Sequence, residues 1–270
     1  MKRKFIGLAA CISLIAFSGI SHAESKLQTI VNSDHRSSEN KTRDAFRHPI
    51  ETLKFFDIKP EHTVVEINPG GGWYTEILGP YLKESGTLYL AIFSDESARS
   101  YAPRLNAKSK TMTANKELYG EVHYTVMDTP THVGPVAPDG SADRVLTFRN
   151  VHNWMADNSG EAAFTSFYKA LKPGGILGVV EHRAKTDKEQ APRALSGYVR
   201  EDYVIKLAEK AGFKLVEKSE INANPKDTAN YKDGVWSLPP SLRAKEKDDE
   251  KYLAIGESDR MTLKFIKPTN

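Results

Sequence analysis

The stretch that decides the fold is "VVEINPGGGWYTEIL", residues 64–78. Its first residues are apolar and β-branched, as in a buried strand, and its last residues have the apolar spacing of a helix. Between them stand three glycines, Gly70 to Gly72. A strand that enters a helix through glycines presents free backbone N–H groups and the positive end of the helix dipole to a ligand. The stretch predicts a ligand-binding turn, with a purely structural strand-to-helix turn as the alternative.

Two common nucleotide motifs do not fit this turn. The dinucleotide fingerprint needs glycines at positions one, three and six, and the sixth position counted from Gly70 is Thr75. A phosphate-binding loop needs Gly-Lys followed by Ser or Thr, which is absent from the chain. The glycine run alone therefore leaves both alternatives open, a ligand-binding turn and a purely structural one.

The rest of the chain alternates between strand and helix patterns. We expect helices around the apolar triad Leu27, Ile30 and Val31 and over residues 45–56, with a loop at 32–44 between them. Further helical patterns cover 161–171 and 199–211, the second ending at Gly212. Such alternation implies a parallel sheet covered by helices on both faces. Strands are expected at 63–67, 87–93, 122–127, 143–148, 176–181, 213–221 and 261–266.

Four segments, in order, resemble the class I S-adenosylmethionine-dependent methyltransferases. "VVEINPGGG" resembles the first motif of that family, an acidic residue followed by Gly-x-Gly-x-Gly, with Asn68 in place of the first glycine. "SADRVLTFRNVHNW" (141–154) resembles its fourth strand and the following loop, and "ALKPGGILGVV" (170–180) its turn into the fifth strand. "RMTLKFIK" (260–267) resembles its last strand. More narrowly, the chain resembles a group of exported bacterial proteins that are predicted methyltransferases.

This resemblance implies a Rossmann-like α/β fold whose seven-stranded, mostly parallel sheet has an antiparallel last strand. It also implies S-adenosylmethionine as the cofactor. The second strand ends in Ile92 and Phe93, where the family has an acidic residue that holds the ribose, so Asp95 is a candidate substitute from the loop. Asp128 matches the position that receives the adenine amino group, or is a turn former ahead of Pro130. The expected cofactor-binding residues are Glu66, Asn68, Gly70, Gly71, Gly72, Asp95, Asp128, Arg149 and Asn150.

Candidate catalytic residues follow the fourth and fifth strands. In an open α/β sheet the ligand lies at the carboxyl ends of the strands, which predicts that His152, Glu181 and His182 meet there. Either histidine, or a buried Glu181, could act as a base toward a methyl acceptor. His152 could instead only begin a helix, and Glu181 could pair with Arg183 or Arg200. These residues with Asp128 have no recognised metal-ligand spacing, so we expect no metal site.

Two tryptophans are candidates for the substrate wall. Trp154 follows the fourth strand, although an aromatic residue there could equally belong to the core. Trp236 lies in a long insert, residues 222–258, which leaves the sheet at its carboxyl edge and is expected to cover the pocket. Trp236 could also merely hold this insert against the core. Residues 24–59 are expected to form a helical cover and residues 60–270 the α/β domain.

The amino terminus predicts export to the periplasm. Lys2, Arg3 and Lys4 precede an apolar run, and Ser21-His22-Ala23 is a small-x-small cleavage site, so we expect cleavage after Ala23. A lipoprotein box ending at Cys11, the only cysteine, is the alternative. The leader holds three of the 38 Lys and Arg residues, and the remaining 35 equal the 35 Asp and Glu residues. This balance argues against binding to nucleic acid or to a membrane surface.

The function predicted from the sequence is methyl transfer from S-adenosylmethionine to a small-molecule acceptor. The alternative is an exported protein of the same fold that binds or turns over another small ligand without methyl transfer, using His152 and Glu181. Export in the unfolded state would strip a cofactor made in the cytoplasm, so the alternative is kept, and the missing acidic residue after the second strand favours it. The glycine turn and Asp128 favour methyl transfer. The sequence does not determine the oligomeric state.

Overall fold

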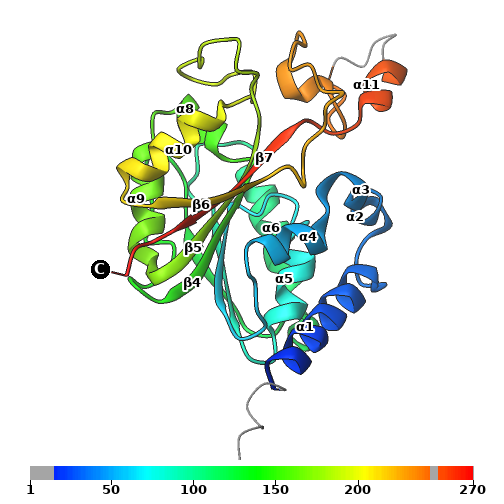
Figure 1. The fold of residues 1–270 in the computed structure, drawn as a ribbon, viewed down its shortest axis with the longest axis vertical. Helices are drawn as coiled ribbons and strands as arrows, with labels where there is room; N and C mark the ends of the chain where they lie inside the picture. Colours follow the sequence, from blue (N-terminus) through cyan, green and yellow to red (C-terminus); the bar gives the residue numbers. More distant parts are fainter. Residues whose placement is uncertain (1–14, 244–248, 270) are drawn as a thin grey trace, which may run out of the picture.

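The computed structural model describes residues 15–243 and 249–269. Its centre is a seven-stranded sheet in the order β3-β2-β1-β4-β5-β7-β6, in which β7 alone is antiparallel to its neighbours (Figure 1). All seven predicted strands are confirmed, as is the antiparallel last strand implied by the family resemblance. The strands are β1 (Thr63–Ile67), β2 (Thr87–Ile92), β3 (Val122–Val126), β4 (Ala142–Phe148), β5 (Leu171–His182), β6 (Lys214–Ser219) and β7 (Arg260–Ile266).

One strand is longer than its pattern predicts. β5 begins at Leu171, five residues before the expected start, because Leu171 already pairs with Ala142 of β4. The ladder then shifts register between Ala142 and Arg144. Proline and glycines in "LKPGG" hid this first part, since both residue types are depleted in strands.

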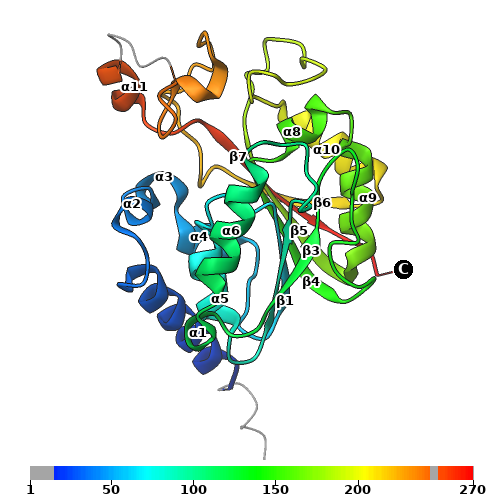
Figure 2. The same cartoon turned by 180° about the vertical axis from the view of Figure 1, so that it is seen from behind.

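Helices cover both faces of the sheet, and each face has its own apolar core (Figures 1 and 2). One core includes residues of α8 (Val151–Ala156), α9 (Gly160–Ala170) and α10 (Glu201–Lys210). The other includes residues of α1 (Ile15–Asn32), α4 (Pro49–Phe55) and α5 (Thr75–Leu82). Two further helices, α6 (Ala102–Thr113) and α7 (Lys116–Tyr119), connect β2 to β3. Alternating strands and helices therefore produce the layered sheet that the sequence predicts.

The segment before the sheet is more helical than expected. Residues 32–44, predicted as a loop, contain α2 (Ser38–Lys41), whose first turn is capped by the Ser37 side chain accepting from Asn40 N–H. The next helix, α3 (Asp44–Arg47), is separated from α4 by His48 at φ +41°. Four-residue helices carry too few apolar positions for a periodic signal, which is why the loop prediction was wrong here.

The insert 222–258 leaves β6 and returns to β7 at the carboxyl edge of the sheet. It contains η1 (Gly234–Ser237) and α11 (Asp249–Ile255), which lie at the same end of the molecule as the loop after β5 (Figure 1). Its first residue is fixed by side-chain hydrogen bonds, because Asn222 Nδ2 donates to Oγ1 of Thr52 and of Thr262. The insert is thus tied to α4 and β7 next to the strand ends.

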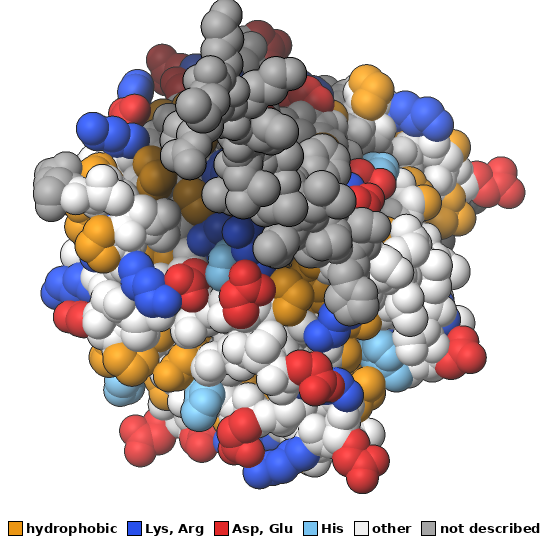
Figure 3. Space-filling view, turned by 60° about the horizontal axis from the view of Figure 1, so that its bottom comes forward, with side chains coloured by type: hydrophobic (Ala, Val, Ile, Leu, Met, Phe, Trp, Pro, Cys, Tyr) orange, Lys and Arg blue, Asp and Glu red, His pale blue; other side chains and the backbone are white. Residues whose placement is uncertain are grey.

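Most of the predicted export signal, including its basic residues and Cys11, lies outside the described residues. Helix α1 runs from Ile15 through Ala23 to Asn32. Among the described residues no helix has the length and apolar character needed to cross a bilayer. Acidic and basic side chains are interspersed on the visible part of the surface in Figure 3, which fits the even charge balance of the sequence.

Candidate functional site

A cavity of about 210 Å³ lies at the carboxyl ends of β1, β4 and β5. It brings together the glycine turn after β1, the loop after β4, the end of β5, one residue of α3 and one of the insert. Its lining includes Arg47, Glu66, Asn68, Gly70, Trp73, Tyr74, Arg149, Asn150, His152, His182 and Trp236. Seven of the residues predicted from the sequence as cofactor-binding or catalytic therefore line one cavity.

The turn after β1 has the backbone that its sequence predicts. Asn68, Gly70 and Gly72 have φ values of +43°, +60° and +80°. A Cβ at Gly70 would meet no atom within 4 Å, whereas one at Gly72 would collide with Cε of Met112. The N–H groups of Gly70 and Gly71 donate to no other described residue. Gly70 therefore leaves an open cradle with free donors, and Gly72 serves the packing of α6.

Glu66, at the end of β1, is a buried carboxyl beneath this turn. The hydroxyl of Thr75, at the start of α5, donates to its Oε2 at 2.7 Å. Burial raises the pKa of Glu66 to about 7, and the hydrogen bond from Thr75 opposes that rise. Because α5 is anchored to β1 through this pair, Glu66 also has a structural role in shaping the turn.

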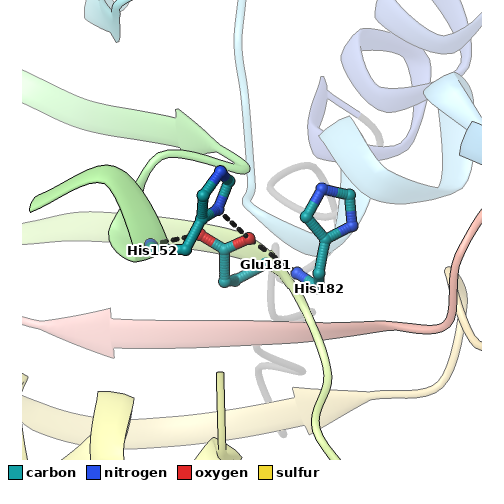
Figure 4. Close-up of side chains that lie close together, drawn as sticks. All are labelled: His152, Glu181 and His182. Carbon is teal, nitrogen blue, oxygen red and sulfur yellow. Dashed lines mark hydrogen bonds and ion pairs between the residues drawn. The ribbon is translucent and has the colours of Figure 1, made fainter. Parts of the chain in front are cut away.

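His152 and Glu181 form a buried pair at the other side of the cavity (Figure 4). The Glu181 side chain is fully buried and accepts from the backbone N–H of His152 at 3.2 Å and of His182 at 2.7 Å. Its Oε1 also lies 3.1 Å from Nδ1 of His152. A carboxylate can only accept, so Nδ1 carries the proton and Nε2, on the ring side away from Glu181, is the basic nitrogen.

His182 is held in the neutral form. Its Nδ1 lies 2.5 Å from Oγ of Ser258 in the insert. Burial lowers the pKa of His182 well below its ordinary value, and the neighbouring His152, Arg149, Arg260 and Arg47 lower it further. A neutral His182 can donate or accept one hydrogen bond with a ligand, but it adds no charge to the cavity.

The three residues His152, Glu181 and His182 also have ligand atoms within 4.8 Å of one another, so geometry alone would allow one metal ion. Asp128, the fourth residue of the set considered from the sequence, is not part of this group. Two features oppose a cation: Glu181 already accepts three N–H groups, and arginines line the same cavity. The site is better suited to proton transfer than to metal binding.

Four arginines and one carboxylate meet beside the cavity. Glu257, at the end of the insert, pairs with Arg43 at 2.5 Å, with Arg47 at 3.2 Å and with Arg260. Burial would raise the pKa of Glu257, but Arg260, Arg47 and Arg43 outweigh it and lower the pKa to about 2. Arg149 follows β4 at φ +63°; its backbone N–H donates to the carbonyl of Val180, but its guanidinium makes no hydrogen bond to another described residue. The group therefore holds more positive than negative charge.

The region expected to hold the nucleoside part of the cofactor is closed. Asp128 is buried, and its carboxylate lies 3.5 Å from Nε of Arg99. Nη2 of the same arginine donates to Asp157 at 2.8 Å. Asp95 has a side chain that is 81% exposed and pairs with Lys110. Two hollows beside Asn68 in this region have volumes of only about 10 Å³ each. Neither Asp95 nor Asp128 lines the main cavity.

Only one of the two tryptophans predicted to line the substrate pocket does so. Trp154 packs in the core against Phe164 and Phe167, with ring centroids 6.2 and 5.3 Å away, and touches only one small hollow. Trp236 does line the cavity, with its ring centroid 5.9 Å from that of His152. The structure thus brings Trp236, but not Trp154, to the main cavity.

Sequence reasoning missed the contribution of Arg47, Glu257 and Arg260. These residues come from α3, the insert and β7, and Arg47 is 210 positions from Glu257 in the chain. No local pattern links them. The one available signal was that ionisable residues stand in segments with the patterns of buried helices and strands. A buried charge needs a partner of opposite charge, so such residues predict buried ion pairs.

Comparisons with known proteins agree with this architecture. No family model and no curated protein matches the chain. Among solved structures, a SAM-dependent methyltransferase from Aquifex aeolicus has a TM-score of 0.55 at 16% identity, covering 90% of this chain and 98% of its own. The [4+2]-cyclase SpnF has a TM-score of 0.57 at 14% identity, covering 94% and 96%. The pyocyanin biosynthetic protein PhzM has 0.52 at 12%, covering 84% and 55%.

At such identities the likeness establishes the fold and nothing finer. The strand order, with β7 antiparallel between β5 and β6, is that of the class I methyltransferases. The chain therefore has the class I methyltransferase fold, with a polar cavity at the place where open α/β sheets bind their ligands. One of the neighbours is described as a cyclase, so the fold alone does not fix the reaction.

Proposed function

We propose that this protein transfers a methyl group from S-adenosylmethionine to a small-molecule acceptor, with His152 as the base. The observation that carries the proposal is the placement of the open Gly70 turn and the His152–Glu181 pair in one cavity. A ligand-binding turn and an oriented base on adjoining strand ends are what transfer to an oxygen or nitrogen acceptor requires.

The residues of the turn fit the cofactor. Gly70 leaves room where a side chain would intrude, and the N–H groups of Gly70 and Gly71 donate to no residue in the described part of the chain. Arg47 and Asn150 line the same cavity and offer polar atoms to a ligand there. When bound, S-adenosylmethionine supplies an electrophilic methyl group on a sulfonium.

The catalytic contribution of the chain is positioning and proton removal. Glu181 fixes the ring of His152 through Nδ1 and through the backbone N–H, so that Nε2 can take a proton from the acceptor. Glu181 also stabilises the imidazolium that results, because the pair is buried and the carboxylate lies within hydrogen-bond distance. Trp236 and the insert reduce the access of water to this side of the cavity.

The second candidate is a ligand-binding or lyase-type protein of the same fold. The closed region where the nucleoside of the cofactor was expected favours this second candidate. There Arg99 forms an ion pair with Asp128, and Asp95 faces solvent. In this alternative His152 and Glu181 act on another small ligand. We further propose that the protein acts in the periplasm after cleavage behind Ala23.

A transfer assay separates the two candidates. The protein is incubated with S-adenosylmethionine carrying a labelled methyl group and with a small-molecule extract, and label in the products is followed by mass spectrometry. We expect a labelled small molecule with the wild type and none with His152→Ala. No labelled product above the enzyme-free control, from protein that binds S-adenosylhomocysteine, would favour the second candidate.

A further inference from the structure

The cavity contains positive charge that the protein itself does not neutralise. Arg47 is 1% exposed, and its Nη2 atom is buried without a hydrogen-bond partner among the residues that the structure describes. Arg149 lines the same cavity, and no described residue accepts a hydrogen bond from its guanidinium. Buried charges and donors without partners are unfavourable, so they are usually kept where a ligand completes them.

The nearby carboxyl groups cannot supply the missing charge. Glu257 is shared by Arg43, Arg47 and Arg260. Glu181 is taken up by His152 and by the N–H of His182. These contacts leave Arg149 and Nη2 of Arg47 as the charged donors of the lining that no described carboxylate accepts from.

Two further ionisable groups of the lining carry less than a full charge near neutral pH, since Glu66 is only about half ionised there and His182 is neutral. Burial raises the pKa of Glu66 to about 7 and lowers that of His182 well below its ordinary value. The same excess of positive charge acts on the arginines, since burial and the charge of Arg260 lower the pKa of Arg149 to about 10. The cavity is therefore electrostatically prepared for an anion.

Arg149 and Arg47 lie near one another in the lining of this cavity: burial lowers the pKa of Arg47, and the charge of Arg149 lowers it further. Arg149 is three residues before His152 in the loop after β4, next to the proposed base. Arg47 lies with its guanidinium carbon 4.9 Å from the ring of Trp73, which follows the glycine turn. In the proposed function the acceptor lies at His152, whose ring is in contact with Trp236, and the cofactor lies at the Gly70 turn.

We infer that the acceptor is an organic anion whose carboxylate or phosphoryl group is bound by Arg149 next to His152. The planar fork of an arginine matches either group with two parallel hydrogen bonds. Such a contact would also place the rest of the acceptor within reach of Nε2 of His152. That the bound anion is the methyl acceptor rests on the proposed function. The anion site itself does not depend on it.

Thermal unfolding with inorganic phosphate as the probe tests the anion site, at ionic strength kept constant with chloride. At about ten times its dissociation constant, phosphate should raise the Tm of the wild type by roughly 3–5 °C. Arg149→Gln should lose this rise and Arg149→Lys should keep part of it. Arg104→Gln, which removes an exposed arginine of α6 outside the cavity lining, should keep all of it.

The source of the anion is decided by titration with two nucleosides. If Arg149 binds the acceptor, Arg149→Gln should change the affinity for S-adenosylhomocysteine less than threefold, and phosphate should still stabilise protein saturated with that ligand. A loss of tenfold or more with S-adenosylhomocysteine, but none with methylthioadenosine, which lacks the carboxylate, would assign Arg149 to the cofactor and overturn the inference.

The remaining outcomes are also decisive. No stabilisation of the wild type by phosphate, or equal stabilisation of Arg149→Gln, would contradict an anion site at Arg149. Stabilisation by phosphate in a protein that does not bind S-adenosylhomocysteine would refute the proposed function and leave the anion site supported. If Arg149→Gln gives no cooperative unfolding transition, Arg149→Lys carries the test, with a reduced rise expected.

Discussion

Nδ1 of His152 lies 3.1 Å from Oε1 of Glu181, and the backbone N–H of the same histidine donates to the other carboxylate oxygen. This double contact fixes both the position and the proton of the imidazole. The sequence could place the two residues at neighbouring strand ends, but it left open which of them is the base. The geometry favours His152 as the base and Glu181 as the residue that positions it.

Replacing Glu181 tests that division of roles without any knowledge of the acceptor. In Glu181→Gln an amide can donate as well as accept, so Nδ1 of His152 loses its obligatory acceptor. Nitrogen NMR of the histidine rings should show the Nδ1–H form of His152 in the wild type and a mixture in the variant. An unchanged spectrum would contradict the positioning role.

With an identified acceptor, replacing His152 and replacing Glu181 should change turnover in different ways. His152→Ala should lower kcat by a factor on the order of 10²–10⁴, because it removes the base. Glu181→Gln should lower kcat and move its pH profile, while KM changes little. Equal unfolding midpoints for His152→Ala and the wild type would show that the loss is chemical; a lost unfolding transition would make the residue structural.

Stability should depend on pH through Glu66. Its pKa rises on folding from 4.5 to about 7, so the folded protein binds a proton more tightly and loses stability as pH increases between these values. Glu66→Gln removes this penalty. The variant should gain roughly 2–3 kcal/mol over the wild type at pH 8, relative to their difference at pH 4. Urea unfolding at both pH values measures this, and a pH-independent difference would contradict it.

Glu257 should be essential to the arginine group. Glu257→Gln leaves Arg43, Arg47 and Arg260 without their common counter-charge and should lower the free energy of unfolding by roughly 3–5 kcal/mol. The matched control is Glu161→Gln, an exposed partner of Lys210, which should cost about 1 kcal/mol or less. Similar losses for the two variants would show that the buried group contributes no more than a surface pair.

The sequence predicted the sheet because each strand carries its own local signal and because parallel strands end at one edge. That rule also brought the glycine turn, His152 and His182 to one cavity, with Glu181 hydrogen-bonded to His152 beside it. It failed for Trp154, since a strand-end residue can turn into the core as well as toward a ligand. It could not find Arg47 or Glu257, because their meeting depends on how the helical cover and the insert pack.

Export should leave this packing intact. Cleavage after Ala23 shortens α1 but keeps Leu27, Ile30 and Val31, which are buried in the core that includes α4 and α5. Intact-mass measurement of protein from the periplasmic fraction should give a chain that begins at Glu24. A lipid-modified species that begins at Cys11 would show the lipoprotein alternative instead.

The two glycines of the turn should behave differently when replaced by alanine. Both have positive φ, which costs an alanine on the order of 1–2 kcal/mol. At Gly72 the added methyl also collides with Met112, whereas at Gly70 it points into open space. Gly72→Ala should therefore be the less stable variant in thermal unfolding, and the reverse order would contradict the assignment of Gly70 as the open cradle.

Calorimetric titration with S-adenosylhomocysteine tests the central claim most directly, that the turn at Gly70 holds the cofactor. The wild type should bind, and Gly70→Ala should bind at least tenfold more weakly while it keeps a cooperative unfolding transition. Equal affinity in the two proteins would place the cofactor elsewhere. No detectable binding by folded wild type at millimolar ligand would contradict the account of this protein as a methyltransferase.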